Sequence, residues 1–258
     1  MRVTTDTIPE KLARFFEEHP RVAVAFSGGV DSSYLLYAAV TCGADVRAYT
    51  VESQFRSPVE RRNSDELAEV LGVRRTIVNV DALSNAELVS NPPNRCYLCK
   101  KIVFGAIIRT AVADEYPTVV DASNVSDDPL ERPGMKALEE MDVLSPLRDA
   151  GLSKSDVRRL SKEAGLKCWN SPSDSCLATR IATGTPITAD LLKRTAETEN
   201  RLRAMGFSGI RVRTLSDGTA RLELPESQIP VLNIHMIEVD RLLKDAYGSY
   251  TVKERTAS

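Results

Sequence analysis

A short polar string near the start of the chain has the composition of a phosphate site. Ser27 to Ser33 read SGGVDSS and follow the apolar run RVAVAF, where a strand is expected to pass into a helix. Adjacent glycines let backbone amides approach phosphate oxygens, and a helix start adds free N–H groups and a positive dipole end. Asp31 is acidic where a phosphate would lie, which indicates a magnesium ion between the two. The residues predicted to hold phosphate and Mg²⁺ are Ser27, Gly28, Gly29, Asp31, Ser32 and Ser33.

A structural interpretation of the same string is a glycine turn followed by a Ser or Asp N-cap, which is a common way to start a helix. A lone glycine pair would favour that interpretation. The full string after an apolar strand is far more specific. We therefore interpret it as a nucleotide-phosphate loop.

The cysteine spacing is the second signal for chemistry. The chain has five cysteines, an odd number without an export signal, so a disulfide framework is a poor interpretation. Cys96 and Cys99 form a C-x-x-C at a predicted helix start, and Cys176 lies in an irregular segment further on. Such thiolates can bind metal or form a redox pair, but free cysteines are also often buried as small hydrophobic residues. We assign Cys42 and Cys168 to the buried class.

The elements that must position these residues alternate along the chain. Apolar runs at 21–26, 46–51, 76–80 and 118–122 predict strands, and helical patterns lie between them, including a long one at 96–116. This alternation predicts an α/β fold built on a doubly wound parallel sheet.

The last seventy or so residues change character. From Thr188 a charged helix, two strand-like runs around 216–218 and another helix to about Tyr247 predict a smaller α+β unit, with a frayed tail from Lys253. We therefore expect a nucleotide domain at 1–167, a cysteine-bearing linker at 168–187 and the small unit at 188–258.

Charge and hydropathy narrow the class of partner. The formal net charge of -2 lacks the positive footprint of proteins that grip a phosphate backbone, which favours a small-molecule substrate over tRNA. The first twenty residues lack the pattern of a signal peptide, and no run approaches the length of a membrane span. We expect a cytoplasmic protein that binds neither nucleic acid nor membrane.

The string at 27–33 resembles the PP-loop signature of NAD synthetases, of the amidating half of GMP synthetases and of several thiolating enzymes. Those families cleave ATP between the α and β phosphates. The resemblance implies an adenine nucleotide alpha hydrolase-like fold with pyrophosphate at 27–33 and adenosine near Thr50 and Val51, at the carboxyl end of a strand. Asn124 and Asp127, in the loop after the fourth strand, are then expected to help place ATP or Mg²⁺.

Further motifs resemble the LarE family in order and spacing, from Val22 to about Leu224. LarE proteins are ATP-dependent sulfur transferases that adenylate the carboxylates of a pyridinium biscarboxylic acid mononucleotide and replace oxygen with sulfur. Their product goes to the nickel-pincer nucleotide cofactor. The matching stretches are 95–100 (RCYLCK), 121–124 (DASN) with Asp127 and Asp128, 132–134 (RPG), 145–147 (SPL), 176–181 (CLATRI) and 211–213 (RVR).

The resemblance also bears on the thiols. In that family the cysteine matching Cys176 handles the sulfur. Some members sacrifice it alone and leave dehydroalanine, whereas others have three cysteines and bind a 4Fe-4S cluster that carries sulfide. Because Cys96, Cys99 and Cys176 follow the three-cysteine pattern, the resemblance implies a cluster here and makes sacrificial use of Cys176 the alternative.

Other site residues also come from the resemblance. It implies that Arg180, Arg211 and Arg213 contact the phosphate and carboxylates of the substrate, groups that suit a planar guanidinium. Arg211 and Arg213 alternate along a predicted strand and so share one face, which favours a joint role. Glu199 is a weaker candidate metal ligand, since a residue on so charged a helix is more often solvated. Thr179 stands where the family usually has serine.

Several alternatives stay open at this level. A PP-loop enzyme could thiolate tRNA or form an amide as NAD synthetase does, and the same fold could serve as a non-catalytic nucleotide-binding regulator. The net negative charge argues against tRNA, and amidation does not need the three cysteines. The sulfur donor, whether sulfide or another, and an expected homo-oligomeric state are not fixed by these motifs.

Overall fold

The computed structural model describes residues 8–56, 58–127, 134–171 and 175–255, with backbone alone for 58–63. The chain forms two compact units. The first comprises 1–53, 59–80 and 94–171, and the second comprises 54–58, 81–93 and 172–258. The second unit thus includes two early segments, 54–58 and 81–93, as well as the C-terminal region. The expected division at 167 and 187 had placed both early segments in the nucleotide domain.

The first unit is built on a parallel sheet of four strands. These are β1 (Arg21–Ala25), β2 (Asp45–Glu52), β3 (Arg75–Asn79) and β4 (Val119–Val120). Their order is β3-β2-β1-β4, and every pairing is parallel. The predicted α/β class with a parallel sheet is confirmed. Since all four strands run the same way, their carboxyl ends meet at one edge, where ligands bind in such sheets.

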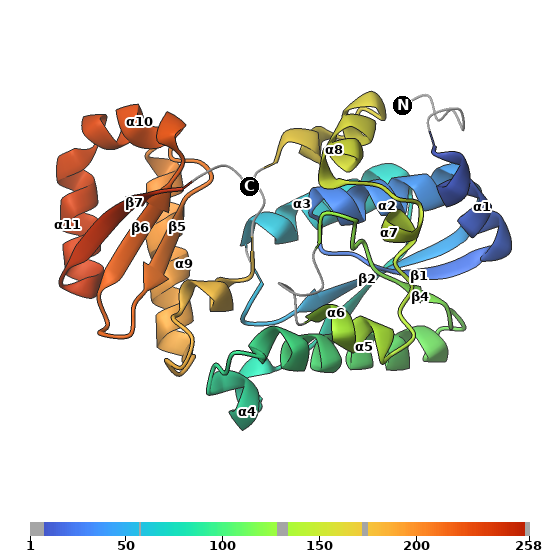
Figure 1. The fold of residues 1–258 in the computed structure, drawn as a ribbon, viewed down its shortest axis with the longest axis horizontal. Coiled ribbons are helices and arrows are strands. Elements are labelled where there is room, and N and C mark those ends of the chain that lie inside the picture. The colour runs from blue at the N-terminus through green and yellow to red at the C-terminus, as the bar shows by residue number, and fades with distance from the viewer. Residues whose placement is uncertain (1–7, 57, 128–133, 172–174, 256–258) are drawn as a thin grey trace. The chain divides into compact units, whose positions relative to one another are not determined.

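Helices cover both faces of this sheet (Figure 1). Side chains of α1, α2, α3 and α8 pack with Val22 and Val24 on one face, and those of α5 and α6 pack with Ala23 and Tyr49 on the other. The helical segments are α1 (Glu10–Glu18), α2 (Val30–Thr41), α3 (Pro58–Leu71), α5 (Arg95–Ala113), α6 (Gly134–Glu139), α7 (Pro146–Asp149), α8 (Lys154–Glu163) and the 3₁₀ turn η3 (Lys167–Asn170).

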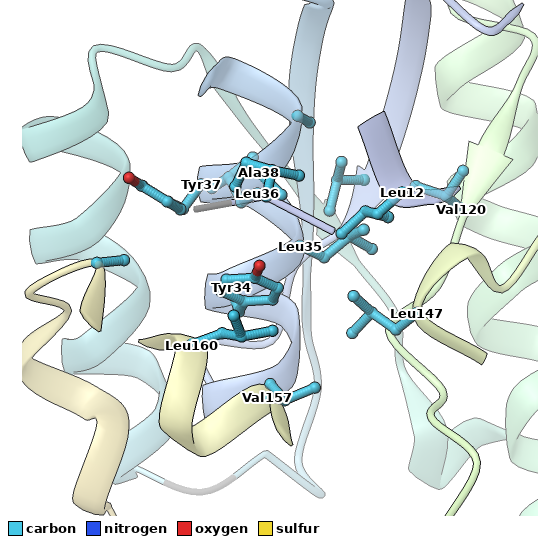
Figure 2. Close-up of a cluster of buried hydrophobic side chains, with 14 of the residues drawn as sticks. Leu12, Tyr34, Leu35, Leu36, Tyr37, Ala38, Val120, Leu147, Val157 and Leu160 are labelled. Carbon is cyan, nitrogen blue, oxygen red and sulfur yellow. The ribbon is translucent and has the colours of Figure 1, made fainter. Parts of the chain in front are cut away.

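Helix α2 is buried along nearly its whole length, with Ser32 to Ala39 all inside. Figure 2 shows Tyr34 beside Leu160 and Val157 of α8, while Leu35 lies toward Leu12 and Leu147. A helix that is apolar on all sides is stable only when it is enclosed on all sides. This enclosure fixes the start of α2, and with it the glycine turn that precedes it.

The second unit has a three-stranded mixed sheet covered by helices on one face. Strands β5 (Arg211–Thr214) and β6 (Ala220–Leu224) are antiparallel, as the turn around 216–218 predicts. Val212, Leu222 and Leu224 are fully buried against α9 (Ala189–Ala204) and α11 (Met236–Tyr247). The remaining segments are η2 (Ala82–Ser84), α4 (Ala86–Val89), η4 (Leu177–Arg180), η5 (Glu226–Gln228) and α10 (Ile229–Ile234).

The expected frayed tail from Lys253 is wrong. β7 (Tyr250–Glu254) pairs in parallel with β6, placing Lys253 opposite Glu223 and Glu254 opposite Leu224. Most of its side chains are exposed, so the segment has no apolar alternation that would predict a strand. Backbone hydrogen bonds to β6 hold it instead.

The helices of the described residues include none that is long and apolar enough to cross a membrane.

Candidate active site

The predicted phosphate loop occupies the connection from β1 to α2. β1 ends at Ala25 and α2 begins at Val30 with Gly29 as its N-cap. Gly28 has a φ of 88°, a left-handed conformation that strains any residue with a Cβ. Gly29 is extended, with φ -74° and ψ 166°. The local sequence therefore fits the turn, and the N–H groups of the first turn of α2 open at the carboxyl edge of the sheet.

Serine hydroxyls stabilise the loop from within. The Gly29 N–H donates to Oγ of Ser27 at 3.2 Å, and Oγ of Ser32 donates to the Gly29 carbonyl at 3.2 Å. The Oγ atoms of Ser27 and Ser32 are 3.1 Å apart. Ser27 is exposed, whereas Ser32 and Ser33 are buried. The loop is thus held by its own hydrogen bonds, so ligand binding does not incur the entropy cost of ordering it.

Asp31 lies at the start of α2 beside the loop that follows β4. Asn124 Nδ2 donates to Oδ1 of Asp31 at 3.3 Å, and the Asn124 N–H donates to Oδ2 of Asp127 at 3.0 Å. Oδ1 of Asn124 in turn accepts from the N–H of Ser126. The structure thereby brings Asp31, Asn124 and Asp127 together next to the glycine turn. Asp128, the neighbouring residue of the family motif, lies outside the described residues.

Thr50 and Val51 belong to the carboxyl half of β2. The Thr50 hydroxyl is fully buried and donates to the carbonyl of Phe26 at 2.9 Å. This bond ties β2 to the residue that enters the phosphate loop. Val51 is only partly buried. Contact of either residue with adenosine stays a prediction.

A buried network on the same sheet edge was not predicted as part of the site. Asp121 follows β4, and its two carboxylate oxygens accept from the hydroxyls of Ser123 and Ser145, each at 2.6 Å. Lys100 Nζ lies 3.6 Å from Oδ2 of Asp121. The motifs at 95–100, 121–124 and 145–147 contained all four residues, but their spacing in sequence did not show that they meet. Lys100 is therefore a cation held at this edge in addition to the predicted residues.

Two pairs of cysteines of the first unit have different surroundings. Cys96 and Cys99 lie in the first turns of α5, with Cys96 exposed and Cys99 partly buried, and neither forms a disulfide. Nη2 of Arg95 lies 3.7 Å from Sγ of Cys96. Cys42 and Cys168 pack against the core around α2, as predicted, and burial raises the pKa of both thiols. A raised pKa keeps a thiol protonated and unreactive.

Cys176 lies in the second unit, directly before η4. It is partly buried and forms no disulfide, and its carbonyl accepts from the Thr179 hydroxyl at 2.7 Å. The Ser175 and Thr179 hydroxyls are 3.0 Å apart. Arg180 Nη1 donates to Oγ of Ser175 at 2.6 Å and to its carbonyl at 3.0 Å. The threonine that replaces the family's usual serine thus uses its hydroxyl to shape the turn that carries Cys176.

Glu199 anchors this turn to the rest of the unit. Its side chain is fully buried, so the solvated position expected from its charged helix is wrong. Oε1 accepts from Arg180 Nε at 2.8 Å and from the Val212 N–H at 2.9 Å. Oε2 accepts from Arg203 Nη2 at 2.8 Å and from Arg180 Nη2 at 3.4 Å. Both oxygens are therefore occupied by donors, which is the arrangement of a structural carboxylate.

Arg211 and Arg213 share the face of the sheet that points away from the helices. Arg213 Nε pairs with Glu223 at 2.7 Å, and its Nη1 donates to the carbonyl of Thr179 at 2.6 Å. Burial, reinforced by the charges of Arg255, Arg180 and Arg213, lowers the pKa of Arg211 to about 10. Arg211 stays protonated at neutral pH. The pair forms a basic face suited to an anion, although its contact with substrate stays a prediction.

No group of three or more His, Cys, Asp or Glu side chains is placed to hold a metal ion in the described part of the chain. Cys96 and Cys99 belong to the first unit and Cys176 to the second. Within the first unit, Asp31 and Asp127 are both carboxylates beside the phosphate loop, and Asp31 lies in the first turn of α2.

The fold and the loop define the class. A glycine turn between a parallel strand and a buried helix, with serine hydroxyls and an aspartate at the helix start, is the nucleotide site of a PP-loop enzyme. The sequence model of the asparagine synthase family matches residues 7–98, which span this loop. A 7-cyano-7-deazaguanine synthase of Thermoplasma acidophilum is 40% identical over 67 residues, 26% of this chain and 28% of its own length.

Longer matches identify the family. The pyridinium-3,5-bisthiocarboxylic acid mononucleotide synthase of Lactiplantibacillus plantarum is 33% identical over 243 residues, 93% of this chain and 88% of its own length. An uncharacterized protein of Synechocystis is 35% identical over 221 residues, 85% of this chain and 82% of its own. The chain belongs to the LarE family of ATP-dependent sulfur transferases.

Proposed function

We propose that this protein uses ATP to activate the carboxylates of a pyridinium-3,5-biscarboxylic acid mononucleotide and replaces carboxylate oxygen with sulfur, for a nickel-pincer nucleotide cofactor. The observation that carries the proposal is the match to the Lactiplantibacillus plantarum synthase along 93% of the chain. The preformed loop at 27–33 supports the ATP half of the reaction, and the basic face of the second unit supports an anionic substrate.

The chemistry divides into two displacements. In the first, a carboxylate oxygen attacks the α-phosphorus of ATP, the bond to the bridging oxygen breaks and pyrophosphate leaves. In the second, a sulfur nucleophile attacks the carbonyl carbon and AMP leaves with the original oxygen. A carboxylate needs this activation because its own oxygen is a poor leaving group. The protein contributes positioning and charge neutralisation in both steps.

The first unit has the groups that the first displacement requires. The N–H groups at the start of α2 and the hydroxyls of Ser27 and Ser32 would bind pyrophosphate. Mg²⁺ is usually held by one or two carboxylates together with phosphate oxygens, so Asp31 beside the loop fits its binding. Bound Mg²⁺ would offset the charge that grows on the leaving pyrophosphate. Asn124 would keep Asp31 oriented through the bond to Oδ1.

We propose Cys96, Cys99 and Cys176 as ligands of a 4Fe-4S cluster. What supports this is that each cysteine is outside any disulfide and reaches the surface at least in part, and that two of them are spaced by one turn of α5. The cluster would supply sulfide from an iron that has no protein ligand. Sacrificial use of Cys176 is the alternative. The sulfur donor and a homo-oligomeric state stay predictions.

Asp31→Asn tests the ATP half of this proposal. The variant should fold normally and lose most pyrophosphate release, because the charge that places Mg²⁺ is gone. Loss of such neutralisation costs on the order of several kcal/mol in the transition state. Substrate-dependent pyrophosphate release from ATP is the measurement.

Asp142→Asn is a matched control in the same unit. Asp142 is exposed and has a φ of 54°, a conformation that asparagine tolerates well. It should release pyrophosphate at the normal rate. Normal release by Asp31→Asn would mean that the loop is not the ATP site.

A further inference from the structure

The turn that carries Cys176 is held by an early part of the chain. Leu177, the next residue, donates its N–H to the carbonyl of Phe55 at 2.8 Å, and Phe55 itself is buried. Gln54 joins this segment to the other early segment of the second unit, since its Nε2 donates to Oδ1 of Asp81 at 2.9 Å. The backbone directly after Cys176 is thus fixed on one side of the turn.

Asn91 holds the chain on the other side of the turn. Its Nδ2 donates to the carbonyl of Ala182 at 2.8 Å and to that of Thr185 at 3.0 Å, and lies 3.4 Å from the carbonyl of Ile181. Its own carbonyl accepts from the N–H of Gly184 at 2.8 Å. The side-chain amide has two N–H groups, and the two shorter bonds use both. One residue therefore fixes the segment that follows η4.

Two properties of Asn91 indicate that these bonds are the reason for its presence. Its exposed fraction is 0%, and buried polar side chains are kept where they are hydrogen-bonded. Its φ is 60°, in the left-handed region that asparagine occupies more readily than most residues. An apolar side chain here would be strained and would leave the carbonyls of Ala182 and Thr185 without these donors.

Asn91 also begins the connection to the other two thiols. Pro92 and Pro93 follow it directly, and Cys96 comes five positions after it. Each proline ring fixes φ, so this short connection has little conformational freedom. The same residue thus holds the segment after Cys176 and begins the stretch that leads to the C-x-x-C pair.

We propose that Asn91 is a positioning residue for sulfur transfer, which fixes the place of the Cys176 thiol through the segment 181–185. The inference rests on the proposed function and adds a residue that acts through the backbone of the turn. Three ligands of one cluster must converge on it, so a loose Cys176 would reduce the ligand set. On the sacrificial route the sulfur must meet the activated carbonyl, and a misplacement of about 1 Å can lower such a rate about a hundredfold. Both routes therefore need a fixed turn.

Asn91→Gly tests this role. Glycine adopts a φ of 60° without strain, so the substitution removes the amide and keeps the backbone. The measurement is the rate at which N-ethylmaleimide labels the Cys176 thiol in the full chain, after a chelator has removed iron. The rate is read from the mass of the peptide that contains Cys176. Labelling is done at a temperature at which calorimetry shows every variant folded.

Two controls separate positioning from general destabilisation. Asn85→Gly makes the same change six positions earlier, where the exposed side chain caps α4 by accepting from the N–H of Leu88 at 2.8 Å. Glycine is an acceptable N-cap. Val239→Ala lowers the stability of the same unit from a different place, because Val239 is fully buried in a cluster formed by residues between 202 and 250.

We expect Cys176 in Asn91→Gly to be labelled about tenfold faster than in the wild type, a change that fits the loss of two buried hydrogen bonds. Asn85→Gly and Val239→Ala should be labelled at the wild-type rate. With ATP, Mg²⁺, sulfide and the pyridinium nucleotide, Asn91→Gly should release pyrophosphate normally in the first turnover but form at least about tenfold less sulfur-containing product per AMP. Equal labelling of Asn91→Gly and the wild type, or equally fast labelling of Val239→Ala, would overturn the role of Asn91.

Asn91→Asp carries the test if Asn91→Gly does not fold. Its carboxyl group has the shape of the amide, and burial beside carbonyl oxygens favours the protonated form, which donates one bond in place of two. Cys176 should then be labelled faster than in the wild type and in Val239→Ala. A wild-type rate would count against positioning by Asn91.

The proposed function and the role of Asn91 fail in different ways. A wild-type protein that forms no sulfur-containing product would contradict the proposed function, whereas the labelling rates would still decide whether Asn91 holds the turn. Normal product formation with unchanged labelling of Asn91→Gly would overturn the role of Asn91 alone.

Discussion

Glu199→Gln is predicted to destabilise the second unit strongly. It keeps the size and shape of the side chain, so no cavity forms. Four donors converge on the carboxylate, two from Arg180, one from Arg203 and one from the backbone of Val212. Whichever way the new amide is turned, its NH₂ group must face two of these donors. The substitution also leaves the charge of Arg180, which is fully buried, without its carboxylate.

The magnitude follows from this arrangement. Removing one partner of a buried ion pair costs about 3–5 kcal/mol. For a domain of 60–100 residues each kcal/mol lowers the Tm by roughly 4–8 °C, so the second unit should unfold more than about 10 °C earlier. Because Arg180 also shapes the turn at 175–180, the reactivity of the Cys176 thiol toward a maleimide should rise at temperatures where the wild type is still folded.

The two units can be followed separately in this experiment. The single tryptophan, Trp169, belongs to the first unit, so its fluorescence reports that unit, whereas calorimetry records both transitions. Glu199→Gln should lower one calorimetric transition and leave the tryptophan transition unchanged. Glu197→Gln, an exposed residue on the same helix, is the control and should change neither. An unchanged Tm for metal-free Glu199→Gln, with loss of a metal-dependent activity, would refute the structural role and favour Glu199 as a metal ligand.

Three further predictions concern the site. Arg211→Ala should weaken substrate binding at least tenfold, since a charge-assisted contact contributes roughly 1.5–3 kcal/mol. Calorimetric titrations should show unchanged ATP binding, and equal losses for both ligands would count against a substrate-specific role of Arg211. Protein purified without oxygen should be brown, and Cys96→Ser or Cys99→Ser should abolish colour and sulfur transfer, whereas dehydroalanine at Cys176 in a colourless, active protein would establish the sacrificial route. The pKa of Glu223 is held low in the folded protein, so its carboxylate stabilises the fold at pH values above its unfolded pKa of about 4.3, and this contribution is lost as pH falls through the folded pKa. Glu223→Gln should therefore flatten the plot of unfolding free energy against pH below about pH 4.3. An unchanged plot would contradict the ion pairs.

The phosphate loop was predictable because its signal is local. The segment from Ser27 to Ser33 combines a turn that requires glycine with serine hydroxyls that form hydrogen bonds inside the turn. Both properties depend on residues that are neighbours in the sequence. The parallel sheet was predictable for a similar reason, since each strand is an apolar run between turn signals. Family motifs then supplied residues for which spacing alone gave no role.

Residues that depend on distant partners were harder to interpret. A charged helix such as 189–204 gives no sign that Glu199 is buried, because its partner Arg180 lies nineteen positions earlier in the chain. The network of Asp121 with Lys100 and Ser145 likewise joins three separate segments. The strand β7 forms through its backbone, and side-chain patterns do not report such pairing.

We propose that the protein couples ATP cleavage to the exchange of oxygen for sulfur on a pyridinium carboxylate. The most direct test is mass spectrometry of the nucleotide after incubation with ATP, Mg²⁺ and a sulfide source without oxygen, with AMP and pyrophosphate quantified in the same sample. We expect one oxygen of the nucleotide to be replaced by sulfur, with the matching gain in mass, for every AMP and pyrophosphate formed. ATP cleavage that leaves the pyridinium nucleotide unchanged, or that yields an amide when ammonia is supplied, would contradict it.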